Sequence, residues 1–342
     1  MLIGLDATYS LGKHLSGVGV YSREIMFGIA RAHPSQRFSY YYRPHRFFKS
    51  FSDSLPRNSR RHLLRGAPPV DLFHSLNQRV DAPARRTIST FHDLFVMTGD
   101  YSSPDFRNRF TLQARQAADN SDAMIAVSRF TASQLEQQLG VEPSRIYVVP
   151  HGASIPSANN AAPRENMVLF VGVVQRRKNV GRLVKAFEQL PAGWRLVLAG
   201  ALEGYGAADE LRAVEESPRR NDIEVIGHQS AAQLDTLYAR ARIFAFPSLD
   251  EGFGMPVLEA MARGVPVVTS NCSAMPEVAG DAALLVDPYR VDDIADALAR
   301  LAADEALRED FIARGKVRVR GFTWESAVAQ TWSVYQELLS KS

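Results

Sequence analysis

Short apolar runs alternate with longer amphipathic stretches over residues 1–150. Runs of this length suit strands that are buried on both faces, and the stretches between them repeat with helical periodicity. The pattern predicts strands at Leu2–Asp6, Phe38–Tyr42, Val70–His74, Thr87–His92, Ala123–Val127 and Ile146–Pro150. It predicts helices at Val18–Ala32, Leu112–Asn120 and Phe130–Leu139. This alternation is typical of βαβ units in a parallel sheet.

The alternation of apolar runs and amphipathic stretches stops at residues 153–166 and then resumes. Ala153–Glu165 has two prolines, an asparagine pair and no apolar periodicity, so we predict a linker there. Further strands are expected at Met167–Val171, Arg195–Ala199, Ile223–Ile226, Ile243–Phe246 and Val265–Thr269. Further helices are expected at Val180–Leu190, Ala208–Glu216, Ala231–Ala241 and Pro256–Arg263.

The chain is therefore predicted to be an α/β protein with two Rossmann-like, doubly wound domains, residues 1–152 and 167–322. Ligands of such sheets bind at the carboxyl ends of the strands, so a cleft between two facing domains is the expected site. A last amphipathic helix, Phe322–Leu339, contains Trp324, Trp332 and Tyr335.

Composition narrows the choice of chemistry. Cys272 is the only cysteine among 342 residues, which excludes a disulfide framework and a cysteine-based zinc site. We find no Asp-x-Asp, no P-loop and no His-Glu-x-x-His motif, so no metal site and no cofactor are expected. The start of the chain has no signal-peptide pattern, and no run approaches the roughly 20 apolar residues of a membrane span. We expect a cytoplasmic protein, free or lying on a membrane surface.

The most informative segment is Phe246–Glu259, where a strand, a glycine-bearing turn and a helix follow one another. Gly252 and Gly254 let the backbone approach a ligand, and the exposed N–H groups of the helix start can hold a phosphate. Glu251 and Glu259 supply carboxylates that accept hydrogen bonds from the vicinal hydroxyls of sugars and riboses. The combination points to a nucleotide sugar. The plainer alternative is an ordinary strand–turn–helix with an exposed glutamate.

Three other segments carry candidate chemistry. Arg176, Arg177 and Lys178 follow Gly172 at a helix start, where cations are disfavoured unless an anion binds, although a solvated charge cluster is the alternative. Gly17 and Gly19 lie in the loop after the first strand, which can also be a plain tight turn. His92 and Asp93 lie at the end of a strand, and adjacent strand residues point to opposite faces, so they need not interact.

These segments together resemble a known family. The run E-G-F-G-M-P-V-L-E-A-M-A-R-G-V-P-V-V, residues 251–268, resembles the signature of the retaining GT-B glycosyltransferases of glycosyltransferase family four. The R-R-K-N run, the loop at residues 16–21 and F-H-D-L resemble other elements of that family. Of these, R-R-K-N and F-H-D-L resemble bacterial mannosyltransferases that use GDP-mannose. The chain departs from the pattern at Ser16, where relatives have glycine, and at Val173, where many have arginine; Arg176 can compensate.

The resemblance implies a GT-B fold, with the last helix, about residues 323–342, packing back on the first domain. It implies that Glu251 contacts the transferred sugar, Glu259 the ribose, Arg177 and Lys178 the diphosphate, and that His92 lies beside the sugar. The implied catalytic set is His92, Glu251, Arg177 and Lys178. The implied donor-binding set is Gly17, Gly19, Gly172, Arg177, Lys178, Glu251, Gly252, Phe253, Gly254, Met255, Pro256 and Glu259. His151, in a V-P-H-G run like the family's strand-to-linker element, is expected to be structural.

The resemblance further implies a metal-independent, retaining hexosyltransferase of bacterial cell-envelope polysaccharide biosynthesis. The favoured reaction moves mannose from GDP-mannose to a glycan or lipid-linked sugar. A UDP-sugar-dependent transferase, another GT-B activity such as an epimerase or phosphorylase, and a catalytically silent sugar-binding subunit stay open as alternatives.

The segment Arg37–Arg65 is basic and aromatic. It has eight cations against one acid, Asp53, with Phe47, Phe48 and Phe51 interleaved. That mixture suits an anionic membrane surface, and we predict peripheral membrane contact through it, without nucleic-acid binding. Base stacking on RNA or a solvated basic loop would give the same composition.

Overall fold

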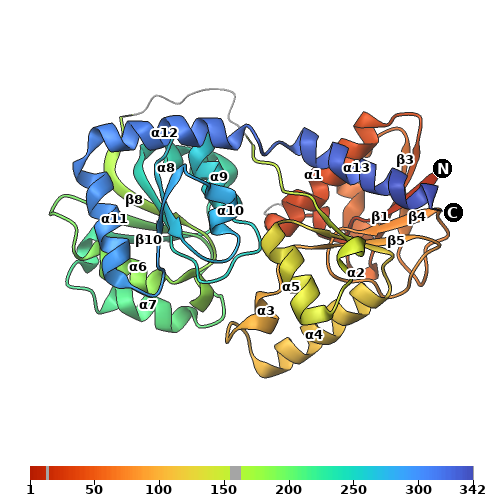
Figure 1. Ribbon diagram of the computed structural model, residues 1–342, viewed down its shortest axis with the longest axis horizontal. Helices are drawn as coiled ribbons and strands as arrows, with labels where there is room; N and C mark the ends of the chain where they lie inside the picture. The colour runs from red at the N-terminus through yellow and green to blue at the C-terminus, as the bar shows by residue number, and fades with distance from the viewer. Residues whose placement is uncertain (13–14, 155–162, 342) are drawn as a thin grey trace. The chain divides into compact units, whose positions relative to one another are not determined.

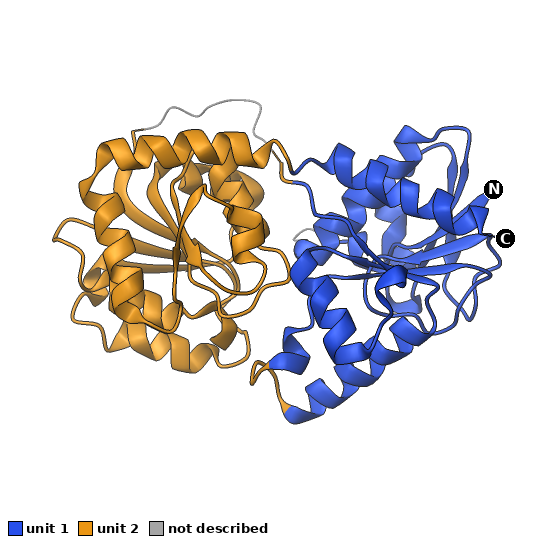
Figure 2. Cartoon of the chain, viewed as in Figure 1, with its two compact units in different colours: residues 1–98, 104–152, 322–342 blue, residues 99–103, 153–321 orange. Residues whose placement is uncertain are grey.

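The computed structural model describes residues 1–12, 15–154 and 163–341. These residues form two compact units (Figure 2). The first comprises residues 1–98, 104–152 and 322–342, and the second comprises residues 99–103 and 153–321. Most of the predicted linker lies outside the described residues, and the first strand after it begins at Glu165 rather than at Met167.

The first unit, within the described residues, has a seven-stranded parallel sheet in the order β3-β2-β1-β4-β5-β6-β7. Its strands are β1 Leu2–Asp6, β2 Arg37–Tyr42, β3 Ser59–Leu63, β4 Leu72–Ser75, β5 Thr87–Phe91, β6 Ala123–Ala126 and β7 Ile146–Val148. Its helices are α1 Gly17–Ala32, α2 Pro44–Phe47, α3 Phe95–Thr98, α4 Pro104–Asp119, α5 Arg129–Leu139 and α13 Trp324–Ser340. The central strands are buried along their length because helices cover the sheet (Figure 1).

The second unit repeats the plan with a six-stranded parallel sheet in its described part, in the order β10-β9-β8-β11-β12-β13. Its strands are β8 Glu165–Val171, β9 Arg195–Ala199, β10 Ile223–Gly227, β11 Ala241–Phe246, β12 Val267–Ser270 and β13 Ala283–Val286. Its helices are α6 Val180–Phe187, α7 Ala207–Glu215, α8 Ala231–Arg240, α9 Met255–Ala262, α10 Met275–Ala279, α11 Val291–Ala303 and α12 Glu305–Val319. The prediction of two doubly wound, Rossmann-like sheets is confirmed.

Both sheets reverse their strand order at one point. In the first unit β1 lies between β2 and β4, and in the second β8 lies between β9 and β11. Ligands of open α/β sheets bind outside the carboxyl ends of the strands at such a switch point. The fold therefore offers two places for a ligand, one on each unit.

The last helix, α13, returns to the first unit, where it packs against α1 (Figure 1). Trp332 stacks on His33 at the end of α1, with ring centroids 3.6 Å apart. Tyr335 is fully buried, and its hydroxyl lies 2.6 Å from Nδ1 of His74 on β4. The amphipathic pattern of the tail is explained by this docking.

The basic segment Arg37–Arg65 is more ordered than a solvated loop. It contains α2, a 3₁₀ turn at Phe48–Ser52 and the edge strand β3. Among the described residues, no helix is both long enough and apolar enough to cross a membrane.

Candidate functional site

Three charged side chains meet at the switch point of the second unit. Arg177 Nη1 lies 2.8 Å from Glu251 Oε2, and Lys178 Nζ lies 2.5 Å from Glu251 Oε1. We call Arg177, Lys178 and Glu251 the cation–glutamate cluster. Lys178 and Glu251 are buried, and Lys178 Nζ also lies 4.4 Å from the ring centroid of Phe246. Two cations share this one carboxylate, and Arg177 Nη1 also donates to the Asp250 carbonyl at 2.8 Å.

Backbone contacts place the two cations. They lie in a 3₁₀ turn, Arg176–Lys178, which follows β8 and ends at Asn179 in a left-handed conformation with φ 60°. The Asn179 amide donates to the carbonyls of Pro247, at 3.0 Å, and Pro288, at 2.7 Å. The Leu249 N–H donates to the Arg177 carbonyl at 2.7 Å. These bonds tie the turn to the segment that follows β11 and carries Glu251.

The cation–glutamate cluster keeps Glu251 ionised. Burial alone would raise its pKa, but the charges of Arg177 and Lys178 and their hydrogen bonds outweigh burial and lower the pKa to about 2. A carboxylate that stays charged at neutral pH accepts hydrogen bonds and does not donate a proton. Glu251 can therefore receive sugar hydroxyls but cannot act as a general acid.

The turn before α9 depends on a glycine. Gly254 has φ 100°, a left-handed conformation that other residues rarely adopt, and a Cβ there would come within 2.3 Å of Met275 Cε. Gly252 and Phe253 are buried, and Pro256 stands in the first turn of α9, where its missing N–H costs nothing. The turn aims the first N–H groups of α9 at the carboxyl edge of the sheet, where they can hold an anion.

Glu259 differs from Glu251 in its hydrogen-bond partner and in the direction of its pKa shift. Its Oε2 accepts a hydrogen bond from the Tyr238 hydroxyl at 3.1 Å. Burial raises its pKa, against the opposing charge of Arg263. The two glutamates of one motif are thus held with opposite shifts of pKa.

In the first unit, Gly17 and Gly19 begin α1, and Ser16 caps the helix by accepting from the Gly19 N–H at 3.4 Å. A Cβ on Gly19 would lie 2.9 Å from the Tyr9 carbonyl, so this glycine lets the helix start pack on the preceding turn. Gly17 is exposed at the helix start. A packing role therefore exists for Gly19 beside the expected donor contact.

His92 is buried just after β5, and its hydrogen bonds define its tautomer. Its Nε2 lies 3.0 Å from the Leu76 carbonyl, which only accepts, so Nε2 carries the proton. Its Nδ1 lies 3.3 Å from Nε2 of His151 and must accept from it. His151, expected to be structural, is thus the direct partner of His92, and both rings pack on Tyr21.

Matches to known proteins agree with this geometry. Residues 153–318 match the family model described as "Glycosyl transferases group 1", and residues 8–155 match "Glycosyltransferase Family 4". The "O-antigen chain mannosyltransferase B" of Escherichia coli is 33% identical over 283 residues, which cover 78% of this chain and 74% of that protein. The chain is a family 4 glycosyltransferase. The resemblance seen in the sequence is confirmed.

Other relatives of the glycosyltransferase are more distant. The "Serotype-specific mannosyltransferase WbdA" of Escherichia coli is 26% identical over 79% of this chain, which spans 36% of that longer protein. Sucrose-phosphate synthase from Thermosynechococcus elongatus has a TM-score of 0.81 at 21% identity, covering all of both chains. Anabaena HepE, solved with UDP and glucose, has a TM-score of 0.73 at 16% identity, covering 98% of this chain and 99% of that one. These structures show the shared GT-B fold.

The predicted site residues of the glycosyltransferase fall into two sets, one on each unit. The second unit brings Arg177, Lys178 and Glu251 into contact. The turn and start of α9, with Glu259, follow in the same segment, and Gly172 follows β8. The first unit carries Gly17 and Gly19 on α1, and His92 after β5. Their roles toward a donor stay predictions.

A buried polar chain in the first unit was not anticipated from the sequence. The Tyr21 hydroxyl lies 2.9 Å from Thr90 Oγ1, which lies 2.8 Å from Nε2 of His74, and His74 contacts Tyr335 of α13. Burial lowers the pKa of His74 to about 3 and that of His92 to about 4. The histidines are neutral at physiological pH and join α1, β4, β5 and α13 of the glycosyltransferase.

We predict that acid destabilises the first unit through these histidines. Unfolded His92 takes up a proton below about pH 6.5, whereas the folded ring does so only near pH 4. The unfolded state therefore gains protons first as pH falls, and about 3 kcal/mol of stability is lost between those values. Replacing His92 by glutamine, which can still donate to Leu76, should flatten this loss in urea unfolding at pH 7, 5.5 and 4. The control is His45→Gln, because His45 is exposed. An equal loss of stability on acidification in both variants would contradict the prediction.

Proposed function

We propose that this glycosyltransferase moves mannose from GDP-mannose to a glycan or lipid-linked sugar, with retention and without a metal ion. The cation–glutamate cluster carries the proposal, because it sets the buried Lys178 and the partly buried Arg177 beside an ionised carboxylate at the switch point of the second unit. A nucleotide sugar needs both: positive charge for its diphosphate and a hydrogen-bond acceptor for its sugar hydroxyls.

Arg177 and Lys178 would stabilise the leaving group. As the bond between the anomeric carbon and the diphosphate oxygen breaks, negative charge grows on that oxygen. Preorganised cations in a buried site stabilise such charge at no further reorganisation cost. The start of α9, set by the turn at Gly254, would add N–H donors. Glu251 would orient the sugar through its hydroxyls.

Retention would follow from substitution on one face of the sugar. The acceptor oxygen bonds to the anomeric carbon on the side that the diphosphate leaves, and the acceptor proton passes to the departing diphosphate oxygen. A covalent intermediate needs a carboxylate nucleophile. Glu251, which is held by two cations with its pKa at about 2, is a weak nucleophile. His92, whose unprotonated Nδ1 already accepts from Nε2 of His151, would contact the sugar and not act as a base.

The choice of mannose rests on relatives: both the 33% identical O-antigen protein and WbdA are named mannosyltransferases. The deciding experiment is a thermal-shift panel of GDP-, UDP-, ADP- and dTDP-sugars with EDTA present. A ligand at about 100 times its Kd adds about 2.7 kcal/mol of stability. A shift with GDP-mannose alone supports the proposal, and a shift with a UDP-sugar reassigns the donor. No shift in folded protein favours a silent sugar-binding subunit. An inverted product by NMR would sink the retaining mechanism.

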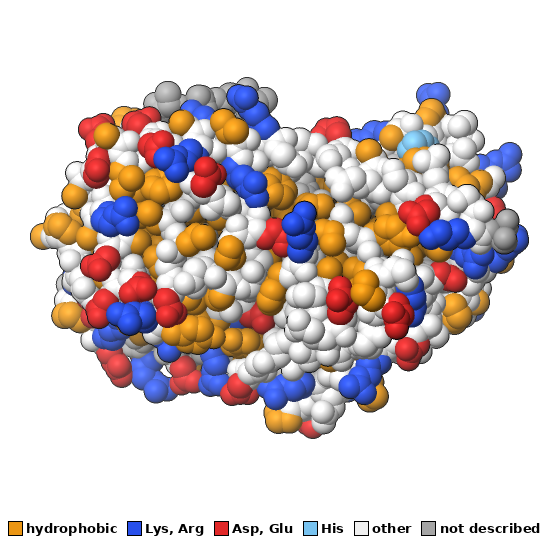
Figure 3. Space-filling view, in the orientation of Figure 1, with side chains coloured by type: hydrophobic (Ala, Val, Ile, Leu, Met, Phe, Trp, Pro, Cys, Tyr) orange, Lys and Arg blue, Asp and Glu red, His pale blue; other side chains and the backbone are white. Residues whose placement is uncertain are grey.

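We also propose that the face formed by α2 and the following 3₁₀ turn contacts an anionic membrane. Phe48 and Phe51 are 84% and 62% exposed, and Lys49 beside them is exposed. Arg43 is buried, and Arg61 donates to the carbonyls of Ser50 and Asp53, so neither belongs to this face. On the face drawn in Figure 3, acidic and basic side chains are intermingled.

The membrane prediction is tested by flotation with vesicles rich in anionic lipid. A fully buried phenylalanine contributes about 1.5–3 kcal/mol and each nearby cation about 1 kcal/mol. Wild-type protein should float with the vesicles, and the double variant Phe48→Ser, Phe51→Ser should stay in solution. The control is Leu112→Ser, which removes a side chain 69% exposed on α4. Equal flotation of all three proteins would refute this contact face.

A further inference from the structure

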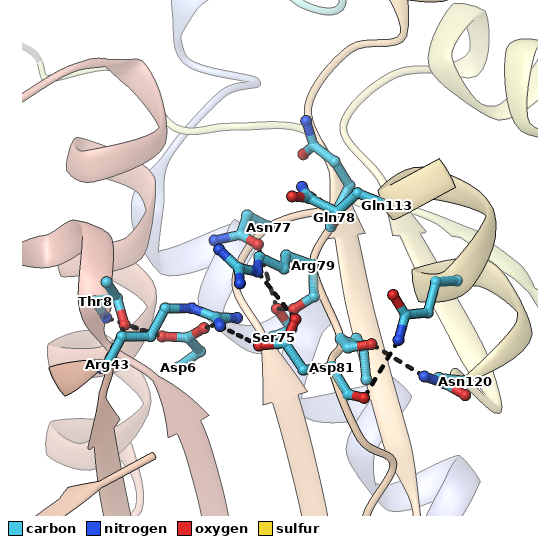
Figure 4. A network of polar contacts seen from close by, with 12 residues as sticks. Asp6, Thr8, Arg43, Ser75, Asn77, Gln78, Arg79, Asp81, Gln113 and Asn120 are labelled. Carbon is cyan, nitrogen blue, oxygen red and sulfur yellow. Dashed lines mark hydrogen bonds and ion pairs between the residues drawn. The ribbon is translucent and has the colours of Figure 1, made fainter. Parts of the chain in front are cut away.

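The switch point of the first unit holds a polar cluster that the donor chemistry does not use (Figure 4). Asp6 is the last residue of β1, Ser75 the last of β4, and Arg43 follows β2 directly. β1 pairs with β2 on one side and β4 on the other. The cluster therefore stands at the carboxyl edge of the sheet where its strand order reverses, which is where such sheets bind ligands.

Arg43 is the centre of the cluster. Its Nη2 lies 3.4 Å from Asp6 Oδ2, and its Nη1 is hydrogen-bonded to Asp81 Oδ2. Asp81 also accepts from Arg79 Nε at 3.0 Å. Asp6 is fully buried and receives the Thr8 hydroxyl at 2.5 Å. Asp81 and Arg79 are half-exposed, so the cluster runs from a buried inner end at Asp6 to a solvent-facing outer end.

The inner part of the cluster contains buried polar atoms that have no hydrogen-bond partner among the described residues. Asn77 is 5% exposed, and within the described residues its Nδ2 donates no hydrogen bond. Arg43 is 6% exposed, and among the described residues its Nε also donates no hydrogen bond. The Gln78 Oε1, next along the chain, is buried and accepts none in the part of the chain described. Buried polar groups in native proteins are nearly always paired, and each one left unpaired is costly, so three together indicate a site built for a polar ligand.

The cluster also adjoins His92. The His92 Nε2 donates to the carbonyl of Leu76, and Asn77 is the next residue. Asn77 Oδ1 lies 3.4 Å from the Ser75 hydroxyl, which donates to the Arg79 carbonyl at 2.8 Å. The loop from Ser75 to Asp81 thus connects the proposed sugar contact at His92 with the unpaired donors.

We propose that Arg43, Asn77 and Gln78, with Asp6 and Asp81, form a subsite for an uncharged sugar residue of the acceptor. This rests on the proposed function, because it names the acceptor chemistry of the same enzyme. A pair of neighbouring hydroxyls both donates and accepts, and it matches the amide and guanidinium donors beside carboxylate acceptors. The ligand enters past Asp81 and Arg79 and pairs with Asn77 Nδ2, Arg43 Nε and Gln78 Oε1.

The charges of the cluster select a neutral ligand. Two arginines, Arg43 and Arg79, face two aspartates, Asp6 and Asp81, so the cluster carries no net charge. Both arginines are already held by carboxylates. Burial raises the pKa of Asp6, against the opposing charge of Arg43 and the hydrogen bonds from Thr8, so the inner end already disfavours negative charge. A phosphorylated or carboxylated sugar would add a further negative charge beside Asp6.

The test measures binding of methyl α-mannoside and of its 6-phosphate to the full-length protein by saturation-transfer NMR. In Asn77→Ala, we expect the Kd for methyl α-mannoside to rise by about fivefold or more, the effect of losing one or two hydrogen bonds. The 6-phosphate should bind more weakly than the neutral glycoside. Unchanged binding in Asn77→Ala, or tighter binding of the phosphate, would overturn the proposal.

A matched control separates this role from a structural one. Asn120 donates to the Val80 carbonyl at 3.0 Å, so its amide is already paired. Asn120→Ala should lower the Tm and leave glycoside binding unchanged, whereas Asn77→Ala should lower the Tm less, because the Asn77 Nδ2 is unpaired and its Oδ1 has only the 3.4 Å contact with the Ser75 hydroxyl. A lower Tm in Asn77→Ala than in Asn120→Ala would mean that water merely hydrates this amide, and would overturn the subsite.

A measurement of donor binding distinguishes the acceptor subsite from the proposed function. Asn77→Ala should keep the wild-type thermal shift with GDP-mannose, since the cation–glutamate cluster belongs to the other unit. A normal donor shift together with no glycoside binding would overturn the subsite alone. Absence of a shift with any nucleotide sugar in the wild type would count against the proposed function, whatever the glycoside does.

Discussion

Replacing Lys178 by methionine should lower kcat/KM for transfer from GDP-mannose by about 100- to 1,000-fold while the protein stays folded. Loss of one preorganised donor to a developing oxyanion costs about that much in enzymes where it has been removed. Lys178 is buried, with Nζ 2.5 Å from Glu251. Arg177 remains 2.8 Å from the same carboxylate, so Glu251 keeps a counterion and the fold is retained.

The measurement is steady-state transfer with the protein checked by circular dichroism. Lys185→Met is the control, because Lys185 is an exposed lysine of α6 that pairs with Glu188 at 3.1 Å. Its rate should match the wild type. If Lys178→Met raised KM for the donor with kcat unchanged, Lys178 would bind the ground state and the transition state equally, and leaving-group stabilisation would be wrong.

Glu251→Gln should lower the free energy of unfolding of the second unit by about 3 kcal/mol at pH 7. The folded pKa of Glu251, about 2, lies below the value near 4.3 of an unfolded glutamate. A depressed carboxyl pKa gives stability that is present above the unfolded pKa and is lost as pH falls through the folded one. The difference between wild type and variant should therefore be full at pH 7 and shrink between about pH 4 and pH 2.

The second glutamate of the motif is the control. The pKa of Glu259 is raised, so its charged form is not favoured by the fold, and Glu259→Gln should be as stable as the wild type or more so at pH 7. Urea unfolding of both variants makes the comparison. Added GDP should restore Glu251→Gln more than it stabilises the wild type, because the diphosphate replaces the missing counterion. An equal loss of unfolding free energy in both variants would show that the cation–glutamate cluster does not stabilise the charged form of Glu251.

The sequence was most informative where local rules and burial agree. Leu2–Asp6 and Arg195–Ala199 have the bounds that their apolar runs predict, because a strand buried on both faces needs such a run. The start of α9 was predicted from Gly254 and Pro256, whose backbone preferences act locally. The contact between Arg177–Lys178 and Glu251 follows from the topology, since β8 and β11 are neighbours.

The remainder depends on contacts between distant residues. The strand β3 has the sequence S-R-R-H-L, which has no apolar pattern, and it is held by pairing with β2 at the edge of the sheet. Arg43 lies in the basic segment predicted to contact a membrane, but its position after β2 buries it between Asp6 and Asp81. The His92–His151 contact joins residues 59 apart. The sequence pattern also did not indicate α10, β13, α11 and α12, whose packing partners lie elsewhere in the second unit.

The return of α13 to the first unit has a consequence for synthesis on the ribosome. Domains usually fold in the order in which they emerge, N-terminal first. Here the first unit lacks α13 and the Tyr335 partner of His74 until residues 324–340 have been translated, by which time residues 153–321 are complete. We therefore expect the unit that begins the chain to finish folding last. A nascent chain halted before Trp324 should hold a folded second unit beside a first unit that is still open to proteases and chaperones along the uncovered side of α1.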